Sequence, residues 1–218
     1  MPLCEYVLKM TKFLFDLDGT LTRFETLPLI ARHFHIKREI EQLTRDTVMG
    51  NVSFEESFRR RVEILGKLPV NQVAEFLSGA ELYPLAVKFI REHAENCRIV
   101  TGNLSCWTEP LIRKIGCKFH ASEALVSNNR IQKIVSVLPK SEIVRQYQRA
   151  GYMAVFIGDG NNDVEAMHVS DTAIAAALTH TPSADVLSAA DYCVTSDSEL
   201  YEQLNELAEF SRRFPPKG

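Results

Sequence analysis

Short apolar runs alternate with amphipathic segments along most of the 218-residue chain. The apolar runs have the length and composition of buried strands, and the amphipathic segments repeat their apolar positions every three or four residues, as helices do. The predicted strands are Lys12 to Phe15, Arg98 to Val100, Ala154 to Ile157, Thr172 to Ala175 and Tyr192 to Val194. The predicted helices are Leu85 to His93, Trp107 to Ile115, Lys140 to Arg149, Asp163 to His168, Pro182 to Ala189 and Glu199 to Arg212. A further alternating segment, Arg130 to Val137, follows two asparagines and predicts a small hairpin. Because strands and helices alternate, the pattern predicts an α/β fold whose parallel sheet is connected by crossover helices.

One region, residues 23–80, departs from this alternation and is helical throughout. Its apolar positions, such as Leu27 and Ile30, recur at helix spacing. A long crossover connection is the simpler interpretation, but a crossover needs fewer helices than this region supplies. We therefore predict a small helical cap domain at 23–80, inserted after the first strand of a core domain formed by residues 1–22 and 81–218.

The composition narrows the class of protein and its partners. Hydrophobic residues make up 45% of the chain and charged residues 24%, as in a globular domain, and the net charge of −3 does not favour nucleic acid as a partner. The five cysteines show no paired spacing, which favours free thiols in a reducing compartment, and the six histidines show no spacing typical of a zinc site. No signal peptide and no apolar run long enough to cross a membrane are visible, so we expect a cytoplasmic protein without a membrane partner. The oligomeric state is left open.

Two carboxylates, Asp16 and Asp18, follow the first predicted strand directly, and Gly19 comes next. Carboxylates in this position project into the crevice at the carboxyl end of a parallel sheet, where such folds place their active sites. One of them can attack a substrate while the other transfers a proton, and the pair attracts a divalent cation. Alone, the same residues are equally typical of a turn that ends a strand.

Two further segments lie at corresponding places. Thr101, Gly102 and Asn103 follow the predicted strand that ends at Val100, and their hydroxyl and backbone N–H groups can donate to phosphate oxygens. Lys140 lies in the first turn of a predicted helix, where a lysine opposes the helix dipole and is not favoured by propensity alone. Lys133, in the predicted hairpin, is the alternative candidate for a lysine in the pocket.

The fourth segment follows the strand that ends at Ile157. Asp159 can complete an oxygen shell for Mg²⁺, and Asp163 opens the next helix, where it can support the metal or the lysine. Asn162 in the same loop is a candidate substrate contact. Four such segments in this order, each at the end of a strand or the start of a helix, favour a phosphate-handling active site over four unrelated turns.

These four segments resemble the four motifs of the haloacid dehalogenase superfamily of phosphohydrolases. The resemblance implies a Rossmann-like core in which Asp16 attacks phosphorus and forms an aspartyl-phosphate. Asp18 then acts as the general acid and base. It also implies that Asp16, Asp18 and Asp159 hold Mg²⁺, with Asp163 beside them. The phosphoryl group would be held by residues of the first three motifs, namely Gly19, Thr101, Gly102 and Lys140.

The predicted cap is similar to that of phosphoserine phosphatases. The resemblance rests on Glu25 and on the segment from Gly50 to Ser57, which is followed by three arginines. It implies that Glu25 meets the substrate ammonium, Phe54 covers the pocket and Arg61 pairs with the substrate carboxylate. An arginine run is also typical of a solvated helix face.

This chain departs from those phosphatases at two positions. They often carry serine where Gly19 stands and glycine where Asn103 stands. The expected function is therefore Mg²⁺-dependent hydrolysis of phosphoserine or a similar small carboxylate-bearing phosphometabolite. The alternatives are another small phosphorylated metabolite such as a sugar or sulfur-salvage phosphate, transfer of the phosphoryl group to an alcohol, or a phospho-accepting signalling module.

Overall fold

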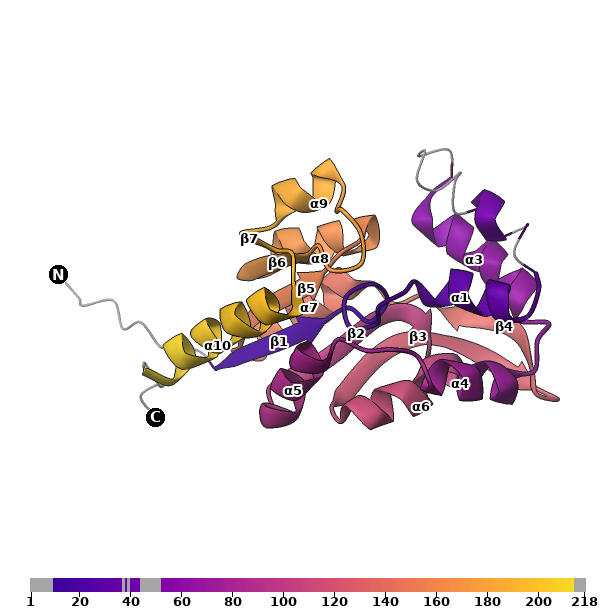
Figure 1. The fold of residues 1–218 in the computed structure, drawn as a ribbon, viewed down its shortest axis with the longest axis horizontal. Coiled ribbons are helices and arrows are strands. Elements are labelled where there is room, and N and C mark those ends of the chain that lie inside the picture. Colours follow the sequence, from indigo (N-terminus) through magenta and orange to yellow (C-terminus); the bar gives the residue numbers. More distant parts are fainter. Residues whose placement is uncertain (1–9, 37, 39, 44–51, 214–218) are drawn as a thin grey trace.

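The computed structural model describes residues 10–36, 38, 40–43 and 52–213. A seven-stranded sheet runs through the molecule in the order β4-β3-β2-β1-β5-β6-β7 (Figure 1). Its neighbouring strands are parallel except for the antiparallel pair β3–β4. The predicted α/β fold with a parallel sheet is confirmed. The strands are β1 Thr11–Phe15, β2 Cys97–Leu104, β3 Lys118–Ser127, β4 Arg130–Ser136, β5 Met153–Gly158, β6 Thr172–Ala176 and β7 Tyr192–Val194.

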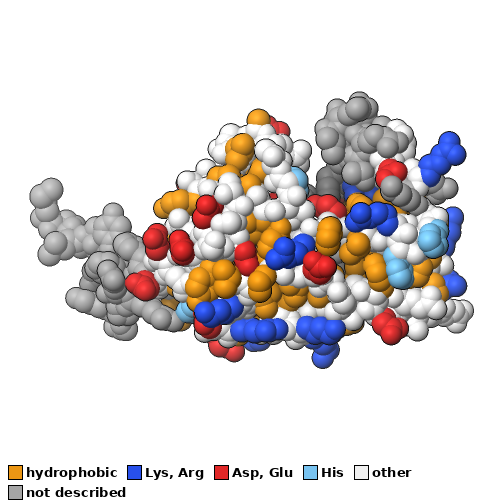
Figure 2. Space-filling view, in the orientation of Figure 1, with side chains coloured by type: hydrophobic (Ala, Val, Ile, Leu, Met, Phe, Trp, Pro, Cys, Tyr) orange, Lys and Arg blue, Asp and Glu red, His pale blue; other side chains and the backbone are white. Residues whose placement is uncertain are grey.

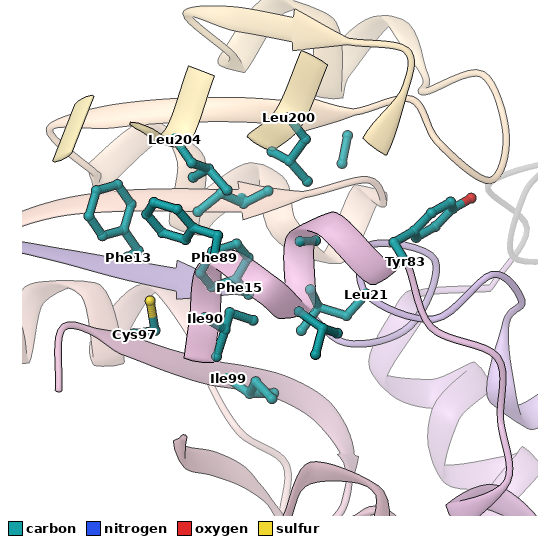
Figure 3. Packing of buried hydrophobic residues seen from close by; sticks show 14 of the residues in the cluster. Phe13, Phe15, Leu21, Tyr83, Phe89, Ile90, Cys97, Ile99, Leu200 and Leu204 are labelled. Carbon is teal, nitrogen blue, oxygen red and sulfur yellow. The ribbon is translucent and has the colours of Figure 1, made fainter. Parts of the chain in front are cut away.

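Helices cover both faces of the sheet. On one face lie α5 Pro84–Glu92, α6 Ser105–Ile115 and α10 Asp197–Arg213. On the other lie α7 Lys140–Arg149, α8 Val164–Val169, which follows a short 3₁₀ turn, and α9 Ala184–Ala189. Strand β1 contributes to both layers because its side chains alternate: Phe13 and Phe15 pack against Phe89 of α5 (Figure 3), whereas Leu14 packs in the opposite layer. Burial on both sides explains why the central strands are apolar throughout rather than alternating.

The strand order reverses at β1, which lies between β2 and β5. The chain moves outward from β1 through β2 and β3 in one direction and returns through β5, β6 and β7 in the other. At such a reversal the loops after the two central strands diverge and leave a crevice at the carboxyl ends of β1 and β5. This crevice is where the acidic motifs were expected.

Helices α1 Thr26–His33, α3 Phe54–Leu65 and α4 Val70–Ser78 lie between β1 and β2, at the opposite end of the molecule from α10 (Figure 1). Their buried apolar faces meet in one cluster that also includes Leu104 at the end of β2 and Trp107 in the first turn of α6. Ile131 and Ile134 of β4 pack against the same cluster. The helical insertion predicted for residues 23–80 is thus present, but its core is shared with α6 and with the β3–β4 hairpin. The domain limits at 22/23 and 80/81 stay a prediction.

The hairpin expected around Arg130 to Val137 is confirmed, and it is joined to the insertion by hydrogen bonds. Asn128 and Asn129 form its two-residue turn with φ of 50° and 59°, a conformation that asparagine tolerates better than most residues. Asn129 O accepts from Val70 N at 3.0 Å, and Asn129 Oδ1 accepts from Asn71 N at 3.0 Å. These bonds hold the start of α4 against the tip of the hairpin.

Two predictions about strands were wrong. No strand was predicted for Lys118–Ser127, because β3 is half-exposed on both faces over much of its length and its sequence shows no clear alternation. The strand predicted to end at Val100 instead continues as β2 to Leu104, and its pairing with β3 shifts register between Thr101 and Leu104. An irregularity of this kind changes the direction in which side chains point from the end of a strand. In the described part of the chain, no helix is both long and apolar enough to cross a membrane.

Candidate active site

The crevice at the ends of β1 and β5 holds a cavity of about 60 Å³. Asp16 follows β1 directly, and its N–H donates to Ile157 O at 2.8 Å, which fixes the end of β1 beside β5. Asp159 follows β5 at the same edge, and both carboxylates are buried. The cavity is lined by residues of the core and of the insertion: Asp16, Asp18, Glu25, Leu27, Phe58, Arg61, Gly102, Asn103, Asp159, Gly160 and Asn162.

Lys140 forms ion pairs with one carboxylate of the first motif and one of the fourth. Its Nζ lies 2.7 Å from Asp16 Oδ1 and 2.6 Å from Asp163 Oδ1, and all three side chains are buried. Burial by itself would lower the pKa of Lys140, but the two carboxylates outweigh it and raise this pKa above its usual value. The ammonium therefore stays charged between Asp16 and Asp163. Lys133, the alternative candidate, lies on β4 and lines a separate surface hollow with α3.

Asp163 is fully buried and bonded on both oxygens. Its Oδ1 accepts from Lys140, and its Oδ2 accepts from the backbone N–H groups of Asp159 at 3.2 Å and Gly160 at 3.1 Å. Asp163 thus fixes the position of the Lys140 ammonium and of the loop that carries Asp159. This geometry favours the supporting role considered for Asp163, while direct coordination of a metal by it stays a prediction.

Asp18 takes part in a network that the sequence did not predict. Its Oδ1 accepts from the backbone N–H of Thr26 at 3.1 Å and from the Thr26 hydroxyl, and its Oδ2 accepts from Thr101 Oγ1 at 3.3 Å. Asn103 Nδ2 donates to Thr26 Oγ1 at 2.6 Å. The candidate acid and base is therefore oriented by the first residue of α1 and by the end of β2. Asn103, which stands where the resembling phosphatases often have glycine, belongs to this network.

Position 19 requires glycine for two reasons: its backbone conformation and the lack of room for a side chain. Its φ of +76° lies in the left-handed region, and a Cβ atom at this position would lie 2.2 Å from Asp159 Oδ2. Its N–H donates to Thr22 Oγ1 at 3.2 Å, so a contact from Gly19 to phosphate stays a prediction. The adjacent Thr20 donates its hydroxyl to Asp159 Oδ1 at 2.7 Å. Thr20 directly follows Gly19 in the sequence, but nothing in the local sequence predicts this contact.

The insertion contributes four residues to the cavity wall, namely Glu25, Leu27, Phe58 and Arg61. Arg61 is buried, its Nη2 donates to Ser57 Oγ at 2.9 Å, and no carboxylate among the described residues forms an ion pair with it. Glu25 is exposed as a residue but lines the same cavity, where burial of its carboxyl, together with the Asp18 carboxylate, raises the pKa of Glu25 to about 7. Phe58 is the aromatic residue that lines the cavity, one helical turn after Phe54, whose side chain lies outside the described residues. Phe58 and Arg61 are three positions apart on α3, so they share one face of this helix.

A divalent cation fits the acidic part of the site. Asp16, Asp159 and Asp163 each place a carboxylate oxygen within 4.8 Å of the other two, and among the described residues Lys140 is the one lysine that forms ion pairs with them. Burial and the neighbouring acids raise the pKa of both Asp16 and Asp159 well above the usual range. A hard cation with oxygen ligands relieves this repulsion. The residues present therefore fit the expected Mg²⁺.

Mg²⁺ is expected to stabilise the protein more at pH 8 than at pH 5. Since the pKa values of Asp16 and Asp159 are raised by folding, the folded state holds more protons than the unfolded chain, and metal-free stability falls as pH rises from about 4. At 100 times its dissociation constant a ligand adds about 2.7 kcal/mol, or roughly 5–10 °C in Tm for a chain of this size. Thermal unfolding followed by circular dichroism with Mg²⁺ or EDTA, at equal ionic strength, measures this. Equal shifts at the two pH values would contradict the assignment of these carboxylates.

Comparison with known proteins gives the class to which this site belongs. Residues 11–171 match the family model of haloacid dehalogenase-like hydrolases. The match covers most of the chain, so the chain belongs to this family of hydrolytic enzymes.

Individual relatives are phosphoserine phosphatases. The chain is 27% identical over 174 residues to phosphoserine phosphatase SerB2 of Mycobacterium tuberculosis, covering 74% of this chain and 42% of that protein. It is 26% identical over 172 residues to the phosphoserine phosphatase of Methanocaldococcus jannaschii, covering 72% of this chain and 80% of that one. The chain thus spans less than half the length of the mycobacterial relative.

Solved structures show the same fold. An apo-form phosphoserine phosphatase matches with a TM-score of 0.73 and 25% identity, over 90% of this chain and 98% of that one. A substrate-bound phosphoserine phosphatase complex matches with a TM-score of 0.75 and 24% identity, over 89% and 98%. The expected family and the Rossmann-like core with a helical insertion are confirmed.

Proposed function

We propose that this hydrolase is a Mg²⁺-dependent phosphomonoesterase that forms an aspartyl-phosphate on Asp16. The observation that carries the proposal is the buried Lys140 ammonium, which lies between Asp16 and Asp163 at the edge of the sheet where Asp18 also lies. Two carboxylates that line one small cavity, with a fixed positive charge paired to the first of them, supply what phosphoryl transfer requires, namely positioning and neutralisation of charge.

The reaction runs in two displacements. A carboxylate oxygen of Asp16 attacks phosphorus, the bond from phosphorus to the ester oxygen breaks, and Asp18 gives its proton to the departing alkoxide. Asp18, now ionised, takes a proton from water as the water oxygen attacks phosphorus, and the bond to Asp16 breaks to release inorganic phosphate. The hydrogen bonds from Thr26 and Thr101 hold Asp18 in place for both transfers. Lys140 offsets the charge of the phosphoryl oxygens.

The Asp16 and Asp159 carboxylates and the Asp18 backbone carbonyl would hold Mg²⁺, which supplies electrostatic stabilisation of the transferring phosphoryl group. Thr20 orients Asp159 through its 2.7 Å hydrogen bond, and Gly19 leaves room for that carboxylate. These positions support the assignments that the family resemblance implies.

Phosphoserine, or a similar small phosphometabolite with a carboxylate, is the substrate that the insertion favours. Arg61 brings a guanidinium without a carboxylate partner among the described residues, which suits a bidentate contact with a substrate carboxylate. Glu25 brings a negative charge for an ammonium, and Phe58 an apolar wall. The relatives named phosphoserine phosphatase support the same substrate.

The test is phosphate release from a panel of small phosphate monoesters that includes L-phosphoserine, with Mg²⁺ and with EDTA. We expect Mg²⁺-dependent turnover in which phosphoserine is preferred. Turnover that is equal in EDTA would contradict the metal requirement. If other esters are hydrolysed and phosphoserine is not, the proposed reaction stands but phosphoserine is excluded as the substrate.

Arg61→Ala is expected to raise KM for phosphoserine about 10- to 100-fold, because a charge-assisted bidentate contact contributes about 1.5–3 kcal/mol. The kcat is expected to change less than KM, since the contact is to a part of the substrate that does not react. Arg60→Ala is the matched control, because Arg60 is exposed on the same helix and pairs with Glu56 at 2.6 Å. A KM that stays unchanged in Arg61→Ala would show that no substrate carboxylate binds there.

A second candidate is the same chemistry on another small phosphorylated metabolite. Asn103 supports it, because its side chain lines the cavity and bonds to Thr26 beside Asp18, where a leaving group would lie. An alcohol that accepts the phosphoryl group in place of water is the corresponding transferase outcome. Product analysis in the panel, which separates inorganic phosphate from a new ester, distinguishes the two.

A further inference from the structure

The loop between β6 and α9 brings a histidine to the mouth of the cavity. Thr179 in this loop donates its hydroxyl to Gly19 O at 2.7 Å and lies 3.2 Å from the hydroxyl of Tyr83. The loop is thereby fixed to the first motif, and the next residue, His180, is placed beside Asp159. No role for this residue follows from the family motifs.

The distance between the His180 ring and the Asp159 carboxylate suits two groups that bind the same metal ion, rather than two groups hydrogen-bonded to each other. His180 Nδ1 lies 3.6 Å from Asp159 Oδ2, which is too long for a hydrogen bond. Two ligand atoms that bind one tetrahedral metal ion at 2.0–2.2 Å lie about 3.4 Å apart. The other oxygen of Asp159 accepts from Thr20, so Oδ2 is the atom directed toward the histidine.

Glu25 is the third possible metal ligand at this place, and the three residues come from separate parts of the chain. Glu25, Asp159 and His180 each place one ligand atom within 4.8 Å of the other two. Asp159 is 2% exposed, whereas Glu25 and His180 are exposed, so the set has a fixed buried member and an open side. On the face shown in Figure 2, histidine and acidic side chains lie at the notch between the α9 region and the helical insertion.

One nitrogen and two carboxylates form a different donor set from that of the Mg²⁺ site. Zinc and similar ions bind imidazole and carboxylate together and are commonly held by three protein ligands and a water. Mg²⁺ prefers oxygen ligands and keeps several waters. The absence of zinc-like spacing among the histidines does not argue against this set, because its members come from the loops after β1, β5 and β6.

We propose that Glu25, Asp159 and His180 form a second cation site, for Zn²⁺ or a similar transition-metal ion, at the mouth of the active site. Its occupancy blocks Glu25 and one oxygen of Asp159. Zn²⁺ therefore inhibits competitively with an ammonium-bearing substrate. This inhibitory consequence rests on the proposed phosphatase function, whereas the binding itself does not.

The binding is tested by titrating the full chain with Zn²⁺, and with Co²⁺ as a spectroscopic probe, in saturating Mg²⁺. The variants are His180→Gln and, as the matched control, His168→Gln on the exposed face of α8. We expect Zn²⁺ to bind His180→Gln at least tenfold more weakly than wild type, with His168→Gln unchanged. Visible Co²⁺ absorption bands typical of a tetrahedral site are expected in wild type and lost in His180→Gln.

Equal Zn²⁺ affinity in wild type and His180→Gln would overturn the proposal, because the ion would then use the acidic residues of the Mg²⁺ site alone. Failure of wild type to bind Zn²⁺ in saturating Mg²⁺ would overturn it as well. Circular dichroism checks that the variant is folded, as expected for a change at a residue whose side chain is 43% exposed. If binding behaves as expected but no phosphate ester is hydrolysed, the metal site stands and the proposed function fails. If phosphatase activity is present but His180→Gln leaves Zn²⁺ binding intact, the proposed function stands and the second metal site fails.

Discussion

Asp16→Asn is expected to lower phosphate release at least 1,000-fold, which corresponds to about 4 kcal/mol in the activation barrier. An amide of nearly the same shape fills the same buried position, but it does not attack phosphorus. Steady-state phosphate release measures the loss. Acid-quenched wild-type enzyme is also expected to carry phosphate in an acid-stable but hydroxylamine-labile linkage, and the variant is expected to carry none.

Asp185→Asn is the control for this substitution, because Asp185 is an exposed aspartate in the first turn of α9. It is expected to retain wild-type turnover. Activity in Asp16→Asn that stayed within tenfold of wild type would exclude Asp16 as the nucleophile and leave a directly attacking water as the mechanism.

Lys140→Met is expected to reduce both turnover and stability. The substitution leaves Asp16 and Asp163 buried without their cation, and removal of one partner from a buried ion pair costs about 3–5 kcal/mol. The loss is expected to be larger at pH 8 than at pH 5, because burial raises the pKa of Asp16, so that its protonation at low pH removes its unpaired charge. Urea unfolding at the two pH values, in EDTA, measures it.

Lys133→Met is the matched control, since Lys133 is the other lysine that the sequence offered for this role and it is exposed on β4. It is expected to leave turnover and the urea midpoint unchanged. If Lys133→Met lost activity while Lys140→Met kept it, the lysine would be misassigned. Lys140→Arg, which keeps the charge but not the shape, tests turnover if Lys140→Met fails to fold.

The parts of the site that local sequence could predict are those that follow strands directly. Asp16 and Asp159 come just after apolar runs, and Lys140 opens its helix at the residue expected. In a parallel sheet, ends of neighbouring strands meet at one edge, so their proximity follows from the order of the elements alone.

The parts that could not be predicted depend on contacts between distant segments. Thr26 bonds to Asp18 because α1 begins beside it, and Asn103 reaches Thr26 across 77 positions of sequence. His180 is placed by the bond from Thr179 to Gly19, 160 positions away. Threonines and histidines in loops are too common for their position alone to predict such a contact.

The strand β3 was missed for a different reason. Its side chains are largely half-exposed, because the insertion and α6 cover it only in part, and a strand without one clearly apolar face lacks the period-two signal. The adjacent turn was easier, since two consecutive asparagines favour the left-handed backbone of a two-residue hairpin loop.

The shared core of the helical insertion has a consequence for how the chain folds as it is synthesised. Residues 26–77 emerge from the ribosome first, but the apolar cluster that they form is completed by Leu104, Trp107 and, from β4, Ile131 and Ile134. The bonds between Asn71 and Asn129 likewise join positions 58 residues apart. Contacts of such long range form late, because the intervening chain must be ordered before they contribute. The helices of the insertion therefore gain their native packing only after the hairpin has been translated, and until then their apolar faces are candidates for capture by a chaperone.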